Sequence, residues 1–388
     1  MIQSSDGLPT PARYYAMATV ILGIAMTVMD GTLVNLALPR ITADLGAGAA
    51  QTIWIVNAYQ IAILMFLLPC AALGDIVGYR RVYLGGLSLY ALGVAACLAG
   101  AFAHSLPALV AMRAAQGLGA AGMMAVNTAL VRMIYPARLL GRGVAINSMI
   151  VAVSAVAGPS VAAGILSAAS WPWLFAVDLP FAVIVLAVGR RALPPNPESQ
   201  PKAALSWLDV ALNAVMFACI FLGVDSLGAH GAGPSGPAFV LLAAGLAVGF
   251  VYLRRQARLA LPVFPIDLLR IPVFALSMCA SITAFASQTI AYVALPFLFI
   301  DAYGRSPWQA GALITAWPVV IIVVAPVVGR LIGRIPDATL GGIGLALLAA
   351  GLGLAALLPE RPANADIVWR LALCGIGFGL FQSPNNHT

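Results

Sequence analysis

The chain has 388 residues, of which 62% are hydrophobic and only 9% are charged, with a mean hydropathy of +0.99. Soluble domains are about 45–50% apolar and about 25% charged, so this composition excludes a chain that folds in water as one compact body. The net charge of +7 does not indicate nucleic-acid binding, because the basic residues lie in loops between apolar segments. The composition predicts an all-α protein that crosses a membrane many times.

The apolar segments can be counted along the chain. Crossing about 30 Å of hydrocarbon takes about 20 consecutive apolar residues. Twelve segments meet this requirement: 14–38, 52–72, 82–103, 106–131, 143–168, 171–188, 207–227, 237–253, 272–300, 308–328, 339–358 and 366–386.

Three regions follow from this spacing. Residues 1–188 form an N-terminal half with six spans, and residues 272–388 form an incomplete C-terminal half. Between them, residues 189–271 hold a proline-rich connector and two inserted spans. This region ends in an amphipathic segment, 254–271, which either lies along the inner membrane surface or forms a basic loop with apolar packing residues.

The basic residues are distributed unevenly between the two sides of the membrane. Placing the N-terminus and the loop at Arg80 on one side puts fifteen of the twenty basic residues there and four on the other, while Arg113 lies within a span. The positive-inside rule then places the N-terminus in the cytoplasm. High alanine and glycine with almost no lysine indicates a bacterial source, and hence a cell inner membrane.

A short polar turn joins the second and third spans. Asp75, Arg80 and Arg81 stand there between long uncharged stretches. Gly74 and Gly78 let the backbone bend tightly and let neighbouring helix ends approach. We expect Asp75 to cap the next helix or to pair with an arginine, and the arginines to fix the side of the membrane. A basic hairpin loop without further function is the alternative.

Asp30 is the first of two charged residues well inside a span. A charge at the centre of a span costs on the order of 2.5–3.5 kcal/mol on insertion scales, so it usually faces a cavity or a partner. Thr27 lies one turn before Asp30 on the same face, whereas Asn35 lies on a different face. A carboxylate in a low dielectric can exchange a proton during a conformational change, so Asp30 is a candidate for proton or substrate binding. The alternative is a hydrogen bond that packs two helices.

Arg113 is the second intramembrane charge. Gln116 shares its face, and Asn127 returns to nearly the same angle, so the three predict a polar stripe toward a water-filled lumen. An arginine keeps its proton, so we expect it to polarise a carboxylate or to hold an anionic group. A structural ion pair is the alternative.

The fifth span carries a predicted bend. Pro159 removes a backbone hydrogen bond and is expected to bend the helix, in a motif that includes Gly158 and Gly164. Ser154, Gly158 and Ala162 form a stripe of small residues, so another helix can approach closely. The stretch fits either a rocking interface or plain packing. Three further acids lie toward the ends of their spans: we expect Asp178 to be solvated near the outer end, and Asp209 and Asp225 to be interfacial.

Four stretches in order resemble the major facilitator superfamily, and specifically its fourteen-helix drug:proton antiporter branch. They are 30–39, the turn 74–81, 113–117 and the Gly158–Pro159 bend. The resemblance implies two six-helix halves around a central cavity with alternating access, an inner-face latch at the turn, a proton pathway near Asp30 and Arg113, and a bend associated with exchange. The chain departs from the family pattern at Ala71, Ala162, Ala163 and Pro172.

The number of spans differs from the resemblance. A degenerate copy of the turn, 329–334, follows the tenth span, eight spans after the first copy rather than six. Two helices are therefore inserted between the halves, and the second half has four helices of an expected six. We expect the chain to be a truncated product.

The predicted function is export of a small, mostly apolar molecule in exchange for protons. The alternative is a truncated, non-transporting membrane protein. We expect no enzyme activity, no cofactor, no metal and no nucleic-acid partner, and a monomer in the bilayer whose partners are a small-molecule substrate and protons. The expected cavity lining is Met26, Asp30, Phe285, Gln288, Tyr292 and Trp317.

Overall fold

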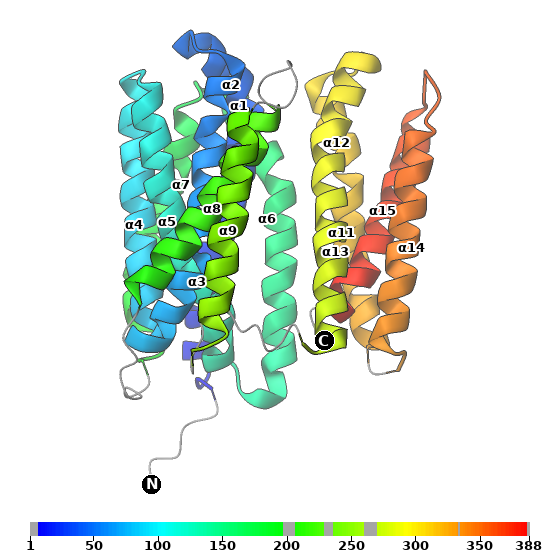
Figure 1. Cartoon of the computed structure of the whole chain (residues 1–388). Helices are drawn as coiled ribbons and strands as arrows, with labels where there is room; N and C mark the ends of the chain where they lie inside the picture. Colours follow the sequence, from blue (N-terminus) through cyan, green and yellow to red (C-terminus); the bar gives the residue numbers. More distant parts are fainter. Residues whose placement is uncertain (1–6, 197–205, 229–235, 260–269, 333, 386–388) are drawn as a thin grey trace. The chain divides into compact units, whose positions relative to one another are not determined.

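The structure is a computed structural model, and it describes residues 7–196, 206–228, 236–259, 270–332 and 334–385 (Figure 1). Within these ranges, twelve helical segments are long and apolar enough to cross a membrane. The predicted all-α polytopic fold is therefore confirmed. The chain divides into two compact units: residues 1–154 with 161–266 form unit 1, and residues 155–160 with 267–388 form unit 2. Residues 260–269 of the predicted amphipathic segment lie outside the described ranges.

Unit 1 is a bundle of long helices. Its core is a set of side chains shared among α1, α3, α4, α5 and α7, and α8 packs against both α9 and α3. The elements are α1 (Ala12–Leu45), α2 (Ala49–Thr52), α3 (Trp54–Val77), α4 (Tyr79–Phe102), α5 (Leu106–Ile134), η1 (Ala137–Leu139), most of α6 (Leu140–Ala168), α7 (Trp173–Ala192), α8 (Trp207–Gly228) and α9 (Gly236–Gln256).

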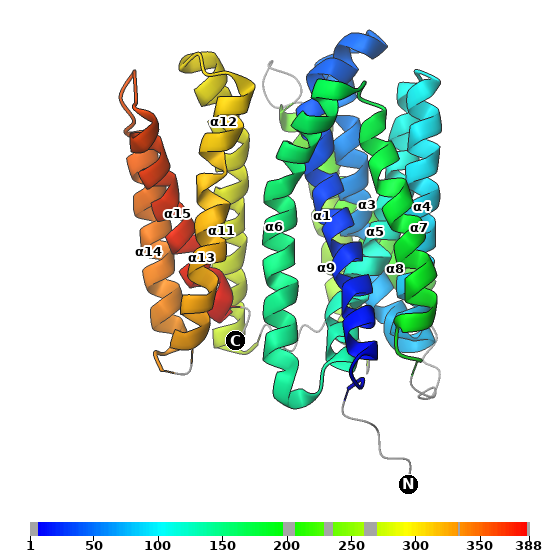
Figure 2. The same ribbon diagram turned by 180° about the vertical axis from the view of Figure 1, so that it is seen from behind.

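Unit 2 contains α11 (Pro272–Phe297), a π-helical turn η2 (Leu298–Ala302), α12 (Pro307–Ile314), α13 (Ala316–Leu331), α14 (Asp337–Ala356) and α15 (Asn364–Asn385). α14 and α15 lie side by side along their length (Figure 2). The span predicted at 308–328 is interrupted at Thr315. Pro318 lacks an N–H group and cannot complete the helical hydrogen bond to Ile314, which weakens the helix at this point.

The turn between α3 and α4 is shorter than expected. Only Gly78 lies between the two helices, so Gly74 and Asp75 are in the last turns of α3, and Arg80 and Arg81 are in the first turn of α4. Gly78 has φ 99°, a conformation that side chains rarely adopt. The polar side chains predicted a longer loop. The backbone reverses direction at a single glycine, so the polar residues belong to the helix ends.

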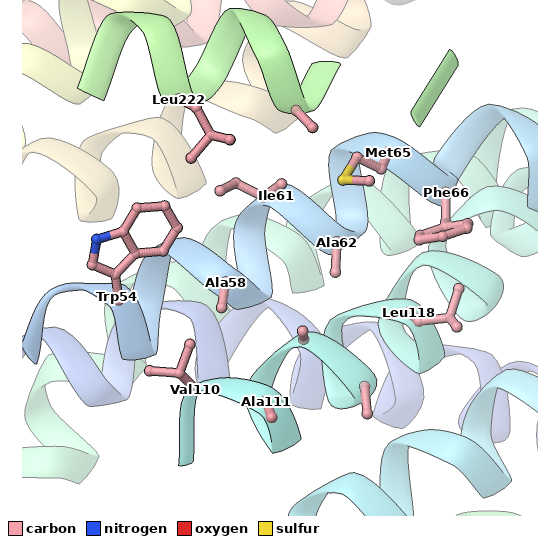
Figure 3. A pocket seen from close by; sticks show the side chains of 13 residues that line it. Trp54, Ala58, Ile61, Ala62, Met65, Phe66, Val110, Ala111, Leu118 and Leu222 are labelled. Atoms are coloured by element: carbon pink, nitrogen blue, oxygen red, sulfur yellow. The ribbon is translucent and has the colours of Figure 1, made fainter. Parts of the chain in front are cut away.

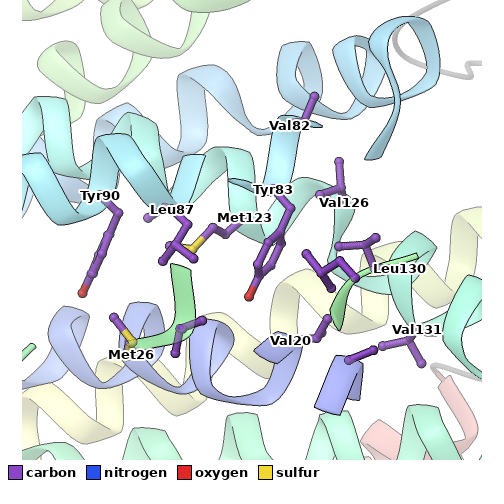
Figure 4. Packing of buried hydrophobic residues seen from close by; sticks show 14 of the residues in the cluster. Val20, Met26, Val82, Tyr83, Leu87, Tyr90, Met123, Val126, Leu130 and Val131 are labelled. Carbon is purple, nitrogen blue, oxygen red and sulfur yellow. The ribbon is translucent and has the colours of Figure 1, made fainter. Parts of the chain in front are cut away.

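Glycines bring α4 and α5 into backbone contact. A Cβ at Gly119 would lie 2.4 Å from the backbone nitrogen of Tyr90, and one at Gly93 would lie 2.7 Å from Cβ of Gln116. Helices approach this closely only where one side lacks a side chain, as in small-residue packing motifs of membrane proteins. Figure 4 shows the side chains beside this seam, with Tyr83 and Tyr90 extending from α4. The Tyr83 hydroxyl donates a hydrogen bond to the carbonyl of Thr19 in α1 at 2.9 Å.

Helices of unit 2 repeat those of unit 1 at a constant spacing along the chain. A Cβ at Gly86 would lie 2.7 Å from the Gly119 carbonyl oxygen, and one at Gly344 would lie 2.7 Å from the Gly377 carbonyl oxygen. The pairs 86 and 344, and 119 and 377, have the same separation. α14 and α15 therefore correspond to α4 and α5.

The same separation relates the other matched helices. A Cβ at Gly117 would lie 2.4 Å from the carbonyl oxygen of Tyr59 in α3, and one at Gly375 would lie 2.4 Å from that of Trp317 in α13. Beyond α1 and α11, Gly46 and Gly304 have φ 58° and 62°. α1, α3, α4 and α5 thus recur as α11, α13, α14 and α15, and α6, α7, α8 and α9 lie between the two sets in the sequence.

Candidate functional site

Asp30 and Arg113 form a buried ion pair inside unit 1. Nη1 of Arg113 in α5 lies 2.7 Å from Oδ2 of Asp30 in α1, and the two side chains are 0% and 2% exposed. Gln116, one turn after Arg113, donates from Nε2 to the same carboxylate oxygen at 3.1 Å and accepts from Arg113 Nη1 at 2.8 Å. The three side chains therefore form a closed hydrogen-bonded triangle between α1 and α5.

The guanidinium of Arg113 is also held by α3. Its Nε donates to the carbonyl of Ile55 at 3.1 Å, and its Cζ lies 4.3 Å from the centre of the Tyr59 ring. The Tyr59 hydroxyl in turn donates to the carbonyl of Thr27 in α1 at 2.9 Å. A charge removed from water is tolerated when it is paired and hydrogen-bonded. Nη2 of Arg113 is buried without a hydrogen-bond partner among the described residues, so the charge is only partly satisfied.

The predicted polar stripe on α5 does not line an open lumen in this structure. Arg113, Gln116 and Asn127 are all buried. Asn127 lies apart from the ion pair, and its Nδ2 donates to Oδ1 of Asn147 in α6 at 3.0 Å. The helical period placed the three residues on one face, but neighbouring helices cover that face. Asn35 is exposed and makes a local contact to the carbonyl of Gly31 at 3.4 Å.

The expectation that Asp178 is solvated is wrong. The residue is 0% exposed in α7, and its Oδ2 accepts a hydrogen bond from the Tyr90 hydroxyl of α4 at 3.2 Å. Asp209 lies in the first turn of α8, and it is 1% exposed, with its Oδ1 2.6 Å from Nε of Arg255 in α9; its interfacial position stays a prediction. Both acids lie near span ends in the sequence, but adjacent helices cover them.

The predicted cavity residues of the second half lie in unit 2. Gln288 and Tyr292 are one turn apart on α11 and interact through their side chains. The Tyr292 ring lies 5.2 Å from that of Trp317, which is fully buried, and the Phe285 ring lies 5.2 Å from that of Phe378. Trp317, like Met26 in unit 1, belongs to a packed core rather than to an open cavity surface. By the repeat spacing, Gln288 corresponds to Asp30.

The latch residues form a polar network at one end of unit 1. Asp75 accepts a hydrogen bond from the Tyr79 hydroxyl at 2.6 Å, within its own α3–α4 corner. Nη2 of Arg80 donates to the carbonyl of Arg190 near the end of α7. Nη1 of Arg81 makes a long contact to the carbonyl of Val77 at 3.4 Å. The network therefore ties α7 to the corner, and a latch role for it stays a prediction.

Asn196 is a site residue that the sequence reasoning missed. Its Oδ1 accepts from the backbone N–H of Arg80 at 2.9 Å, and a Cβ at Gly78 would lie 2.2 Å from its Cγ. Asn196 lies in the proline-rich connector, far from the turn in sequence, and no signal distinguishes it there because the neighbouring residues are also polar or proline.

The predicted helix-bend residues lie in one continuous helix. α6 runs without interruption from Leu140 to Ala168 and includes Gly158, Pro159 and Gly164. Gly158 is buried, whereas Gly164 is exposed with open space beside it. Their role in exchange stays a prediction.

An apolar cavity of about 490 Å³ lies between α3, α5 and α8. Figure 3 shows Trp54 and Ile61 of α3 and Leu222 of α8 around it. Ala111 and Leu118 of α5 also line it, on the helix face opposite Arg113 and Gln116. The cavity is therefore separate from the ion pair.

The molecule has many apolar helices long enough to span a membrane, with a buried ion pair among them. It is therefore a multi-pass membrane protein built on a repeated set of helices. The chain belongs to the major facilitator superfamily, whose family model matches residues 20–388.

Comparisons with named proteins support this family assignment. The chain is 47% identical over 388 residues to the uncharacterized transporter YebQ of Escherichia coli (strain K12), covering 99% of this chain and 83% of that protein. It is 30% identical over 375 residues to the tetracenomycin C resistance and export protein of Streptomyces glaucescens, covering 96% and 68%. Its fold is similar to the proton:xylose symporter XylE bound to 6-bromo-6-deoxy-D-glucose, with TM-score 0.66 and 13% identity over 97% of this chain and 81% of that chain. These proteins are transporters.

Proposed function

We propose that this chain is a secondary active transporter that exports a small, mostly apolar molecule in exchange for protons. It works by alternating access and belongs to the fourteen-helix drug:proton antiporter branch. The branch assignment is supported by α8 and α9, the seventh and eighth spans, which follow a six-span N-terminal half and precede α11. Export by the Streptomyces glaucescens relative supports the direction of transport.

The observation that carries the proposal is the pairing of Asp30 with Arg113. A buried carboxylate next to a permanent cation can be released by protonation, because a neutral carboxyl no longer attracts the guanidinium strongly. Protonation of Asp30 would loosen the contact between α1 and α5, and deprotonation would restore it. Proton binding is thereby linked to helix movement within unit 1.

The repeat supports different roles for the two units, with proton binding in one and substrate contacts in the other. The positions in unit 2 that correspond to Asp30, Arg113 and Gln116 hold Gln288, Leu371 and Cys374. None of these three carries a permanent charge. Proton coupling therefore belongs to unit 1, while Gln288 and Tyr292 offer neutral hydrogen-bonding groups beside aromatic rings, which suits an apolar substrate with few polar groups.

The orientation follows from the basic residues. In unit 1, Arg13 donates to the carbonyl of Leu8 at 2.8 Å and lies 5.8 Å from the ring of Tyr135, so the N-terminal segment is at the same end as the end of α5. Arg80 contacts Arg190 at the end of α7. The positive-inside rule makes the N-terminal end cytoplasmic, in a bacterial inner membrane.

The test is dye efflux from bacterial cells that express the chain, with and without a protonophore. We expect efflux that the protonophore abolishes, and that falls to the background of empty cells in Asp30→Asn at equal membrane insertion. Asp225→Asn, on α8 and away from the ion pair, is the matched control and retains efflux. Efflux that persists in the protonophore or in Asp30→Asn contradicts proton exchange. Absence of efflux from the inserted wild-type chain contradicts dye export.

A further inference from the structure

Asp178 is a buried acid that the proposed exchange does not use. Its Oδ2 accepts one hydrogen bond from Tyr90, and its Oδ1 is buried with no hydrogen-bond partner among the described residues. An ionised carboxylate in a low dielectric needs a cation or several donors, and leaving one without them costs several kcal/mol. One neutral hydroxyl does not meet this need, so the geometry fits the protonated acid.

The charges around Asp178 agree with this reading. The buried titratable groups of this region are Asp30 of α1, Tyr59 of α3, Tyr90 of α4 and Arg113 of α5, and Cζ of Arg113 lies 5.8 Å from the ring centre of Phe175, one turn before Asp178 on α7. Arg113 is the buried cation of this group, and its Nη1 is already paired with Asp30. Two buried carboxyls thus face one guanidinium, and a single bound proton makes the cluster neutral.

We propose that Asp178 is a second proton-binding site of unit 1, which holds a proton while Arg113 is paired with Asp30. The proton comes from water and returns to water when the carboxyl ionises, so no other bond is made or broken. Tyr90 positions the acid by donating to Oδ2. Proton binding at Asp178 is independent of any substrate, whereas its part in coupling rests on the proposed function.

If the cluster stays neutral, removing either acid lowers the number of bound protons, whereas removing the arginine raises it. Asp178→Asn removes the protonated acid directly. Asp30→Asn frees Arg113 to compensate Asp178, which then ionises and also loses its proton. Arg113→Gln leaves two carboxyls without a cation, so both become protonated.

The experiment is infrared spectroscopy of the purified full chain in lipid vesicles at neutral pH, with exchange into deuterium oxide to identify carboxylic acids. The wild type is expected to show a carbonyl stretch of a protonated acid. That signal is lost in Asp178→Asn and in Asp30→Asn, and about doubles in Arg113→Gln. Asp209→Asn, which removes a buried acid paired with Arg255, leaves it unchanged.

Two results overturn the proposal. One is a wild-type chain without a protonated-acid signal at neutral pH, and the other is a signal that survives in Asp178→Asn. Because Asp178→Asn could fail to fold, Tyr90→Phe provides a second measurement: the signal remains and shifts to higher frequency, since the carbonyl loses its donor. An unshifted signal in Tyr90→Phe also contradicts the assignment. These readings do not depend on efflux, so failure of dye export and failure of the proton site are distinguishable.

Discussion

Nη1 of Arg113 lies 2.7 Å from Oδ2 of Asp30, and neither side chain is more than 2% exposed. The pair joins α1 to α5, and the contact of Arg113 Nε with the carbonyl of Ile55 adds α3. One guanidinium therefore joins three helices of unit 1 through two differently directed groups, Nη1 and Nε. This geometry depends on the shape of arginine as well as on its charge.

Arg113→Lys tests the shape directly. A lysine keeps the positive charge but cannot reach Asp30 and the Ile55 carbonyl with separate groups, so one hydrogen bond to a charged group is lost. We expect the free energy of unfolding to fall by about 1.5–3 kcal/mol and efflux to be lost. Thermal unfolding in detergent and dye efflux are the measurements. Arg132→Lys, at an exposed site on the same helix, is the control, and an equal effect of both changes would refute the assignment.

Gly78→Ala tests the corner between α3 and α4. The new Cβ would meet Asn196 Cγ at 2.2 Å in a backbone conformation with φ 99°. Strain at such a position costs about 1–3 kcal/mol, so the unfolding temperature should fall. Gly85→Ala, in α4 with open space beside it, should not lower it.

Asn196→Ala separates the clash from the backbone strain. Alone it removes the acceptor of the Arg80 N–H group, for about 0.5–1.5 kcal/mol. Combined with Gly78→Ala it removes the clashing side chain, so the double variant should lose less stability than the sum of the two single changes. If the losses of unfolding free energy were additive in a double-mutant cycle, Asn196 would not be in steric contact with the side chain introduced at position 78.

The seam between α4 and α5 allows a comparison of adjacent glycines. A Cβ at Gly86 would lie 2.7 Å from the carbonyl of Gly119, whereas Gly85 has nothing within 4 Å. Gly86→Ala should cost about 1–3 kcal/mol through overpacking, and Gly85→Ala should be neutral or slightly stabilising.

The repeat extends this comparison to unit 2. Gly344→Ala should be as damaging as Gly86→Ala, because its Cβ would lie 2.5 Å from the backbone nitrogen of Phe381. Gly342→Ala has open space and serves as control. Urea or thermal unfolding of the four alanine variants is the measurement, and tolerance of Gly344→Ala would argue against equivalent seams.

The apolar cavity should accept extra side-chain volume. Ala115 lines the space of about 490 Å³ between α3, α5 and α8, so Ala115→Leu should leave stability unchanged or raise it. Ala120, on the same helix, is 0% exposed within the core, and Ala120→Leu should cost about 1–3 kcal/mol. If both changes destabilise the protein equally, the cavity does not have room for a leucine side chain in the membrane-embedded protein, and the prediction is wrong.

Some site features were readable from local sequence. Asp30 and Arg113 stood out because a charge within an apolar segment is costly and needs a partner. The α3–α4 corner stood out by its charges, although its helices extend to within one residue of each other. Asn196, by contrast, is separated from Gly78 by four helices, and no local pattern links the two.

The amino-acid sequence by itself determined the membrane class, the twelve spans and the two intramembrane charges, because hydropathy acts over about 20 residues at a time. Only the tertiary structure decided that Arg113 pairs with Asp30 and that Asn127 donates a hydrogen bond to Asn147. It also decided that neighbouring helices bury Asp178 and Asp209. Helical periodicity defines the face on which a side chain lies, but the neighbour on that face depends on how whole helices rotate and pack. Here that packing is set by backbone contacts at glycines such as Gly86 and Gly119.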